Sequence, residues 1–177
     1  FMVDEFHEYF DLKKISIQAS YSGVGGFTMF NEREDIAEGG LYTKDFLMKR
    51  LMIALGGKAA ESIFYGDDFV SLGATMDLNT ANELAVDMIE RYGMGNRMKL
   101  FYKKPASVIN ELSEKTKSLI DTEARHLVEE AYKKTMEVLS SQKCQIEHMI
   151  DALMDSVNMN EDEFSTVFSQ GCNLYMG

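Results

Sequence analysis

The chain has 177 residues, of which 45% are hydrophobic and 27% are charged, and its formal net charge is −11. That length can bury one sizeable core, so we expect one main domain with at most a small additional helical layer. An acidic chain repels a phosphate backbone, and no cluster of lysine or arginine with interleaved aromatic residues offsets that repulsion. Nucleic acid is therefore not expected as a partner.

Three features bear on where the protein works. Cys144 and Cys172 lack the spacing of a metal knuckle or a disulfide framework, which favours a reducing compartment. The most apolar stretch, around 51–55, is interrupted by basic residues and is too short to cross a bilayer, so we expect a soluble chain. The start at Phe1 has no features of a signal peptide, and we interpret the chain as a fragment of a longer protein.

Two short strands are predicted near the N-terminus. Segment 12–19 alternates with the period of a half-buried strand. A glycine-rich turn at 22–26 leads to 26–30, whose aromatic and β-branched residues predict a second strand. The acidic run 31–40 ends in two glycines and predicts an exposed loop. The residues expected to share one face of the first strand are Ile15, Ile17 and Ala19.

Helical periodicity begins after the strands. A buried helix is predicted from the N-cap Thr43 to Gly66. Gly56 and Gly57 in its middle cost about 1 kcal/mol each relative to alanine, so we expect another backbone to approach closely there. A second, strongly amphipathic helix is predicted from Asp77 onward, ending at the glycines that follow it.

The sequence pattern of the C-terminal part predicts only helices. A long helix is expected over 113–142, and a second one places its apolar residues on one side. The last helix begins at Asn160, with Glu163 as its capping-box partner. We therefore predict a mainly α (α+β) fold, with a small β-sheet near the N-terminus and a C-terminal helical subdomain. The apolar residues of the second helix are Ile146, Met149, Ile150, Leu153 and Met154.

The histidines offer one candidate metal site. On a helix, His7 and Asp11 would share a face and could bind one metal, with Glu8 as general base. A ligand helix must continue past its second ligand, whereas strand periodicity starts within a few residues. A helix end followed by a turn is the favoured interpretation. His126 and His148 each lie alone among solvent-type residues and are interpreted as surface histidines.

A second candidate is the small-residue loop at 71–76, which leads to the carboxylate of Asp77 at the start of a helix. Judged by the local pattern alone, Asp77 is an N-cap, which contributes about 1 kcal/mol. A metal-binding carboxylate is the alternative, and the surrounding sequence bears on the choice.

Several motifs stand in a fixed order along the chain. They are Gly26-Phe27-Thr28-Met29, Leu55-Gly56-Gly57-Lys58-Ala59-Ala60-Glu61, Phe64-Tyr65-Gly66, Gly73-Ala74-Thr75-Met76-Asp77-Leu78 and Met88-Ile89-Glu90-Arg91-Tyr92-Gly93-Met94. In this order and at close to this spacing, they resemble the peptidase domain of FtsH-type membrane proteases. The resemblance covers about residues 12–168 and includes the helical tail.

The resemblance implies a zinc site. In that family, zinc is bound by both histidines of an HExxH helix and by a carboxylate at the junction that contains Asp77 here, which makes Asp77 the third ligand. Three protein ligands leave one position open for a water that the metal acidifies, and the Glu of HExxH takes its proton. Glu61, in the glycine-containing motif, is expected to orient a ligand histidine.

The resemblance also implies a substrate-binding edge strand at Gly26, Phe27, Thr28 and Met29. An exposed edge offers unpaired N–H and C=O groups, so an extended substrate can add to it as a further strand. The alternative is that these residues only line the core.

The chain departs from the family pattern in three respects. The HExxH motif precedes the first strand in the family, does not occur in these residues, and is expected just upstream of Phe1. Met76 stands where the family commonly has Asn, and His7 aligns with neither ligand histidine. With one of three zinc ligands and no general base, the chain contains no catalytic residue that we can assign. We expect it to bind zinc poorly and not to hydrolyse peptides.

The resemblance implies the proteolytic domain of an ATP-dependent zinc metalloendopeptidase that degrades membrane and unfolded proteins. Because no GxxxxGK[ST] loop occurs here, ATP and Mg would bind a separate AAA+ ATPase module. The full protein is expected to form a homo-hexamer, anchored in a bacterial inner or an organellar membrane, with this domain in the cytoplasm, matrix or stroma. The expected divisions are a zinc-peptidase-like core at 1–106, lacking the HExxH helix, and a helical subdomain at 107–177.

Two alternatives stay open. One is a non-catalytic pseudo-peptidase or oligomerisation scaffold of the same fold, which the sequence upstream of Phe1 would distinguish. The other is an unrelated helical interaction module whose glycine motifs match by chance.

Overall fold

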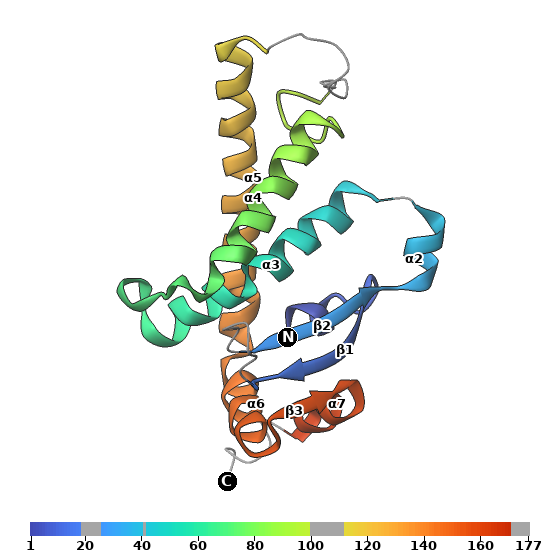
Figure 1. Ribbon diagram of the computed structural model, residues 1–177, viewed down its shortest axis with the longest axis vertical. Helices are drawn as coiled ribbons and strands as arrows, with labels where there is room; N and C mark the ends of the chain where they lie inside the picture. Colours follow the sequence, from blue (N-terminus) through green and yellow to red (C-terminus); the bar gives the residue numbers. More distant parts are fainter. Residues whose placement is uncertain (19–25, 41, 100–111, 171–177) are drawn as a thin grey trace. The chain divides into compact units, whose positions relative to one another are not determined.

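The computed structural model describes residues 1–18, 26–40, 42–99 and 112–170 (Figure 1). The chain forms two compact units. One comprises Phe1–Leu41 with Val138–Gly177, and the other comprises Tyr42–Glu137. Most described residues are helical, and the strands form one small sheet, so the predicted mainly α (α+β) fold is confirmed. None of the helices in these ranges combines the length and the apolar content that crossing a membrane requires.

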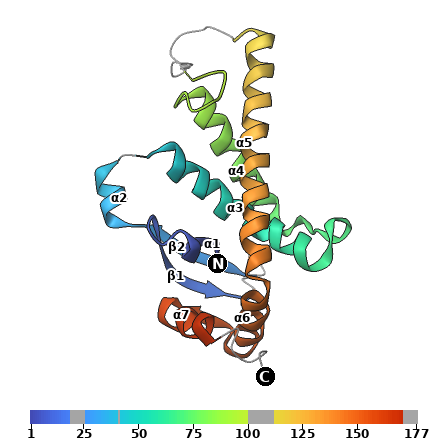
Figure 2. The same cartoon turned by 180° about the vertical axis from the view of Figure 1, so that it is seen from behind.

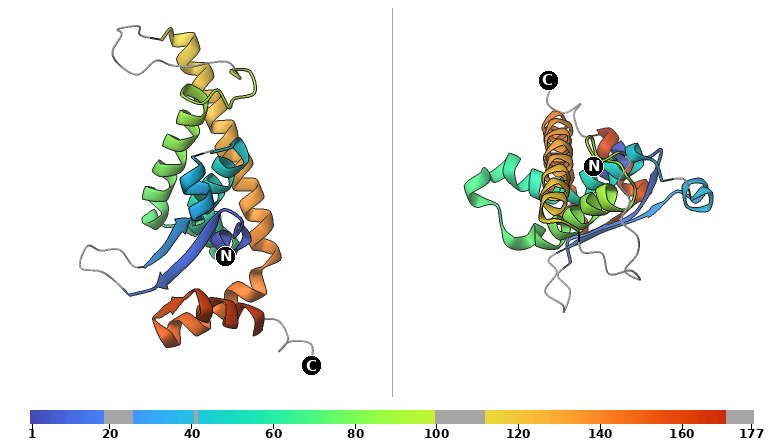
Figure 3. Two further views of the ribbon diagram at one scale, coloured as in Figure 1. Left: turned by 90° about the vertical axis from the view of Figure 1, so that its right-hand side faces the viewer. Right: turned by 90° about the horizontal axis from the view of Figure 1, so that it is seen from above.

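The sheet of the first unit is antiparallel and has the order β2-β1-β3. Its two longer strands, β1 (Phe10–Ser16) and β2 (Phe27–Glu32), confirm the two predicted strands and lie side by side in Figure 3. The third strand, β3 (Asn158–Asn160), pairs with the end of β1 and was not predicted, because its three residues are too few to show a period. The order leaves β2 at an edge of the described sheet.

A bulge in β1 changes which residues face inward. The pairing register shifts between Leu12 and Lys14, so β1 holds one residue more than β2 there. An additional residue resets the in–out alternation of a strand. Ser16 is consequently buried, and Ile17, which was predicted on the apolar face, is 37% exposed. The predicted face is therefore wrong beyond the bulge, and Ala19 lies outside the described residues.

The helices of the first unit include one that the sequence did not predict. The run expected to be a loop at 31–40 contains α2, which ends at Gly40 with the left-handed φ of 59° that glycine adopts readily at helix ends. On the predicted apolar side of α6, Ile146 and Met149 are buried, whereas Ile150 and Met154 are exposed. The bounds are α1 Met2–Glu5, α2 Glu34–Gly39, α6 Lys143–Ser156 and α7 Glu161–Gln170.

The predicted capping box at the start of α7 is confirmed. The backbone N–H of Glu163 donates to Asn160 Oδ1 at 3.0 Å, and the backbone N–H of Asn160 donates to Glu163 Oε2 at 2.8 Å. These reciprocal bonds satisfy donors that a helix start leaves without partners. Phe164 in the next turn is 1% exposed and anchors α7 to the core of this unit, where its ring contacts Phe1.

The second unit is built on α3 (Lys44–Tyr65), α4 (Thr75–Glu90) and most of α5 (Glu114–Ser141), with α4 packed along α3 (Figure 2). As predicted, Thr43 caps α3, and its Oγ1 accepts the N–H of Phe46 at 3.1 Å. Two 3-10 turns, η1 (Asp67–Phe69) and η2 (Leu72–Ala74), connect α3 to α4. The fully buried residues that form this core include Leu51, Ala59, Ala81, Ala85, Met88, Ile89 and Ala131.

The backbone after α4 is held by a buried carboxylate. Glu123 of α5 is 8% exposed and accepts the backbone N–H groups of Asn96 and Arg97, each at 2.7 Å. Gly95 lies so close that a Cβ there would overlap this carboxylate. Glu123 thereby joins the end of α4 to α5 through charge-assisted hydrogen bonds.

Replacement of Glu123 tests this role. We expect Glu123→Ala to reduce the free energy of unfolding by about 1–3 kcal/mol, because two backbone donors lose their acceptor. Glu130→Ala is the control, since Glu130 lies on the same helix and pairs with Lys134 in a solvent-exposed bridge. Its expected effect is below about 1 kcal/mol. Urea unfolding of both variants measures the difference, and equal losses would contradict the role of Glu123.

Candidate functional site

Asp77 is the third residue of α4 and is not the N-cap that the local sequence pattern favoured. The helix begins at Thr75, and the preceding Ala74 makes no side-chain capping bond. The reason is that η2 continues directly into α4, which starts the helix two residues before Asp77. The carboxylate is therefore not used to cap the backbone.

Within the described ranges, no hydrogen bond or ion pair engages the Asp77 side chain. Although the residue is exposed to solvent, partial burial raises the pKa of Asp77 above its ordinary value. Its place in the first turn of a helix favours negative charge, because the backbone N–H groups there carry positive partial charge. Asp77 thus offers an unengaged carboxylate in a partly desolvated position.

Helix α3 supplies the residue opposite this carboxylate. A Cβ placed on Gly57 would stand 3.9 Å from Asp77 Oδ2, and outside the adjacent turns of α3 no other atom of the described residues lies within 4 Å of it. At Gly57 the neighbour is therefore a side-chain carboxylate and not a backbone, while the predicted backbone approach at Gly56 stays a prediction. Gly57 leaves space beside Asp77 that a larger side chain would occupy.

Glu61 lies one turn further along α3, where residues four apart share a face. Its Oε2 accepts the backbone N–H of Ser71 at 2.7 Å, and its Oε1 accepts the Ser71 hydroxyl at 2.8 Å. The Ser71 backbone N–H, followed by the hydroxyl, holds the pKa of Glu61 below its ordinary value. The carboxylate of Glu61 is therefore bound to the loop that leads to Asp77.

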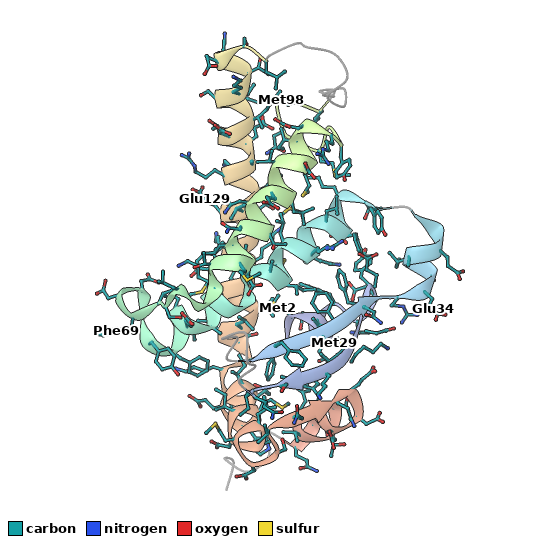
Figure 4. All side chains as sticks on the ribbon, in the orientation of Figure 1. Met2, Met29, Glu34, Phe69, Met98 and Glu129 are labelled. Atoms are coloured by element: carbon teal, nitrogen blue, oxygen red, sulfur yellow. The ribbon has the colours of Figure 1, made fainter. Side chains whose placement is uncertain are left out.

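The connection between α3 and α4 also carries exposed apolar side chains. Gly66, with φ of 85°, turns the chain out of α3, and the Ser62 hydroxyl donates to the Asp67 carboxylate. Figure 4 shows Phe69 on this protruding connection. The exposure of these side chains and the contact of Ser71 were not predicted, because no helical or strand period marks them. The exposed fractions are 68% for Tyr65, 76% for Phe69, 89% for Leu72 and 78% for Met76.

The histidine candidates do not form a metal site. Helix α1 ends at Glu5, the ring of His7 contacts the Asp4 carbonyl at 3.1 Å, and β1 begins at Phe10, so the helix end and turn are confirmed. His126 is exposed, as expected. Across residues 1–18, 26–40, 42–99 and 112–170, no three His, Cys, Asp or Glu residues gather closely enough to hold a metal ion. These residues alone therefore do not build a zinc site, and Asp77 offers a single donor.

A hollow in the second unit lies away from Asp77. It is lined by Gly95, Asn96 and Arg97 after α4 and by one face of α5 that includes Glu123 and His126. Both oxygens of Glu123 already accept backbone N–H groups. The hollow contains none of the residues predicted for the site and is not the candidate site.

Of the residues predicted for the site, the structure brings Glu61 and Asp77 to one side of α3 in the second unit. The predicted edge-strand residues, Gly26 to Met29, belong to the first unit. Phe27 is 44% exposed and Met29 is 52% exposed, so these two do not line a core; Figure 4 labels Met29 on β2. Gly26 packs so closely on β1 that a Cβ would stand 2.8 Å from the Ser16 carbonyl oxygen.

The comparison with protein families agrees with these observations. Residues 3–167 match the model of peptidase family M41. The chain therefore belongs to peptidase family M41, a family of zinc metalloproteases.

Individual relatives carry the same description. The chain is 31% identical to the ATP-dependent zinc metalloprotease FTSH 1, chloroplastic, of Arabidopsis thaliana, over 96% of the chain and 25% of the relative. It is 29% identical to FtsH 3 of Synechocystis over 92% of the chain and 28% of the relative. It is 32% identical to FtsH 2 of Sphaerobacter thermophilus over 89% of the chain and 23% of the relative. The chain thus spans only a minor part of each relative's length.

A substitution at Gly57 tests the space beside Asp77. We expect Gly57→Ala to raise the free energy of unfolding by up to about 1 kcal/mol, because alanine favours the helix and its Cβ meets only ordinary contact. Gly95→Ala should instead destabilise the chain, because its Cβ would overlap the Glu123 carboxylate. Urea unfolding measures both variants. A loss at Gly57→Ala as large as at Gly95→Ala would show that the space is filled.

The bond between Glu61 and Ser71 predicts a dependence on pH. Because the folded-state pKa of Glu61 lies below 4.5, its stabilising contribution is complete above that pH and is lost as the pH falls through the folded value. The stability difference between the wild type and Glu61→Ala should therefore be present at neutral pH and shrink in acid. Thermal unfolding across this range measures it, and a difference that stays constant would contradict the ionic character of the contact.

Proposed function

We propose that this chain is the proteolytic domain of an ATP-dependent zinc metalloendopeptidase, in which Asp77 supplies one zinc ligand. The observation that supports Asp77 as a zinc ligand is its carboxylate, which has no bonding partner among the described residues and lies in the first turn of α4 beside Gly57 of α3. The relatives are named as ATP-dependent zinc metalloproteases, which supports the reaction class. The remaining zinc donors would come from histidines outside the 177 residues, because HExxH does not occur in them.

Zinc in such a site would acidify a bound water and polarise the substrate carbonyl. The residues of this chain would contribute positioning. Asp77 would hold one side of the ion, and Gly57 would leave the adjacent space open for the other donors. The orientation of a ligand histidine by Glu61 stays a prediction, although both of its oxygens already accept bonds from Ser71.

For substrate binding, we propose that an extended peptide adds to β2 as a further strand. This is supported by the position of β2 at the sheet edge and by the exposure of Phe27 and Met29. Backbone hydrogen bonds made this way carry little sequence preference, which suits the degradation of unfolded and membrane proteins. Thr28 and Gly26 complete the proposed edge.

The wider assembly is also a proposal. A separate AAA+ module would bind ATP and Mg, the full protein would form a homo-hexamer, and a membrane anchor would hold it in a bacterial inner or an organellar membrane. The name of one relative, chloroplastic, is consistent with an organellar setting for that protein. We also propose that residues 1–106 form the peptidase core and residues 107–177 a helical subdomain.

The second candidate is a non-catalytic scaffold of the same fold. It is favoured by one observation, namely that the described residues gather no group of three potential metal ligands. The two candidates differ in whether the full-length product of the encoding gene binds zinc.

The test compares the 177-residue chain with that full-length product. The chain alone should not cleave casein when zinc is added, because it contains one of three proposed donors. The full-length product should cleave casein with ATP and zinc, and a chelator should abolish the cleavage. Asp77→Asn in that product should lower zinc affinity by at least about tenfold. Replacing a group that only hydrogen-bonds to a metal ligand already costs about that much.

Asp68→Asn is the matched control, because Asp68 is an exposed carboxylate in the same connection. It should retain both zinc and cleavage. A full-length product without zinc would favour the scaffold. Chelator-sensitive cleavage by the 177-residue chain alone would show that the proposed set of donors is wrong.

A further inference from the structure

We propose that Glu61 is a positioning residue that acts on Asp77 through Ser71, by fixing the point at which α4 begins. This inference rests on the proposed function, since it assumes that Asp77 binds the metal. It assigns Glu61 a different task from orienting a histidine: its carboxylate holds the protein's own loop in place.

The first step is the contact itself. Glu61 engages Ser71 twice, through the backbone N–H at 2.7 Å and the hydroxyl at 2.8 Å. Two short bonds from one ionised carboxylate to one residue fix both its distance and its orientation. The loop is thereby attached to a rigid helix at a defined residue.

The second step carries this attachment to α4. Ser71 Oγ also accepts the N–H of Gly73 at 3.0 Å, which makes Ser71 the N-cap of η2. The Thr75 hydroxyl donates to the Leu72 carbonyl at 2.7 Å, which joins η2 to the first residue of α4. Ala74 between them is 5% exposed and anchored in the core. The position of Ser71 therefore determines where α4 starts, and Asp77 follows in its first turn.

The third step explains why the attachment point lies on α3. Gly57 and Glu61 are four residues apart and share one face of that helix. Gly57 faces the Asp77 carboxylate, and Glu61 holds Ser71. Both ends of the segment 71–77 therefore contact the same face of α3. A shift of the loop along α3 would move Asp77 away from the space beside Gly57. A metal ligand must be held within a fraction of an ångström, which this arrangement can provide.

Hydrogen exchange of the 177-residue chain, without metal, tests the attachment. Glu61→Ala should speed exchange of the Ser71 and Gly73 amides by at least about tenfold, because a hydrogen bond to a charged group contributes about 1.5 kcal/mol or more, which is at least tenfold, and Ser71 loses two. Glu61→Gln keeps an acceptor and should largely restore protection. Glu83→Ala, an exposed glutamate of α4, is the control and should change neither amide. Unchanged exchange in Glu61→Ala would overturn the proposal.

Zinc affinity of the full-length product, measured by chelator competition, tests the consequence. We expect Glu61→Ala to weaken zinc binding by about 10–100-fold, as loss of a supporting group typically does. Ser71→Ala should also weaken it, and the double variant should lose no more than Glu61→Ala alone, because both residues act through one contact. A residue that oriented a histidine directly would give a large effect at Glu61, a negligible one at Ser71, and additive losses.

The outcomes separate this inference from the proposed function. If Asp77→Asn lowers zinc affinity and Glu61→Ala does not, the positioning role is wrong and the zinc assignment stands. If neither variant alters zinc affinity, or if the wild type holds no zinc, both are overturned. Should Glu61→Ala fail to fold, Ser71→Ala and Glu61→Gln provide the same comparison.

Discussion

The packing of α4 along α3 is the constraint on which the candidate site depends. Both helices bury small and flexible apolar side chains against each other, with Ala59, Ala81 and Met88 fully enclosed. One turn of α3 then contributes a glycine and a carboxylate to the same side. The glycine faces Asp77, and the carboxylate of Glu61 holds the preceding loop. The helix pair therefore determines both the position of the proposed ligand and the open space beside its carboxylate.

This arrangement gives one donor of a zinc site and not a whole one. The described residues gather no group of three potential metal ligands, so the proposed zinc site would need donors beyond those residues. A carboxylate that is already in position, with space beside it, suits such a shared site. It would not have to move when the metal and the other donors bind. Membership of peptidase family M41 supplies the reaction class, and the edge strand β2 suggests how a peptide would be held.

Elements with local signals were predictable from the sequence. Residues close together in the sequence determine the cap at Thr43, the long helix α5 and the reciprocal cap of Asn160 with Glu163. The structure contains all three. The bulge after Leu12 was not predictable, because it depends on how β1 pairs with another strand. The site shows the same limit. Asp77 was recognisable by its motif, whereas the contact between Glu61 and Ser71 joins residues ten positions apart across a turn.

The central claim is that the carboxylate of Asp77 binds the zinc ion of a family M41 peptidase. Anomalous X-ray diffraction at the zinc edge, on crystals of the full-length product, tests it most directly. The account predicts an anomalous peak about 2.0–2.2 Å from an Asp77 carboxylate oxygen, with the remaining protein donors being histidine nitrogens. A fully occupied zinc peak whose ligands do not include Asp77 would contradict it.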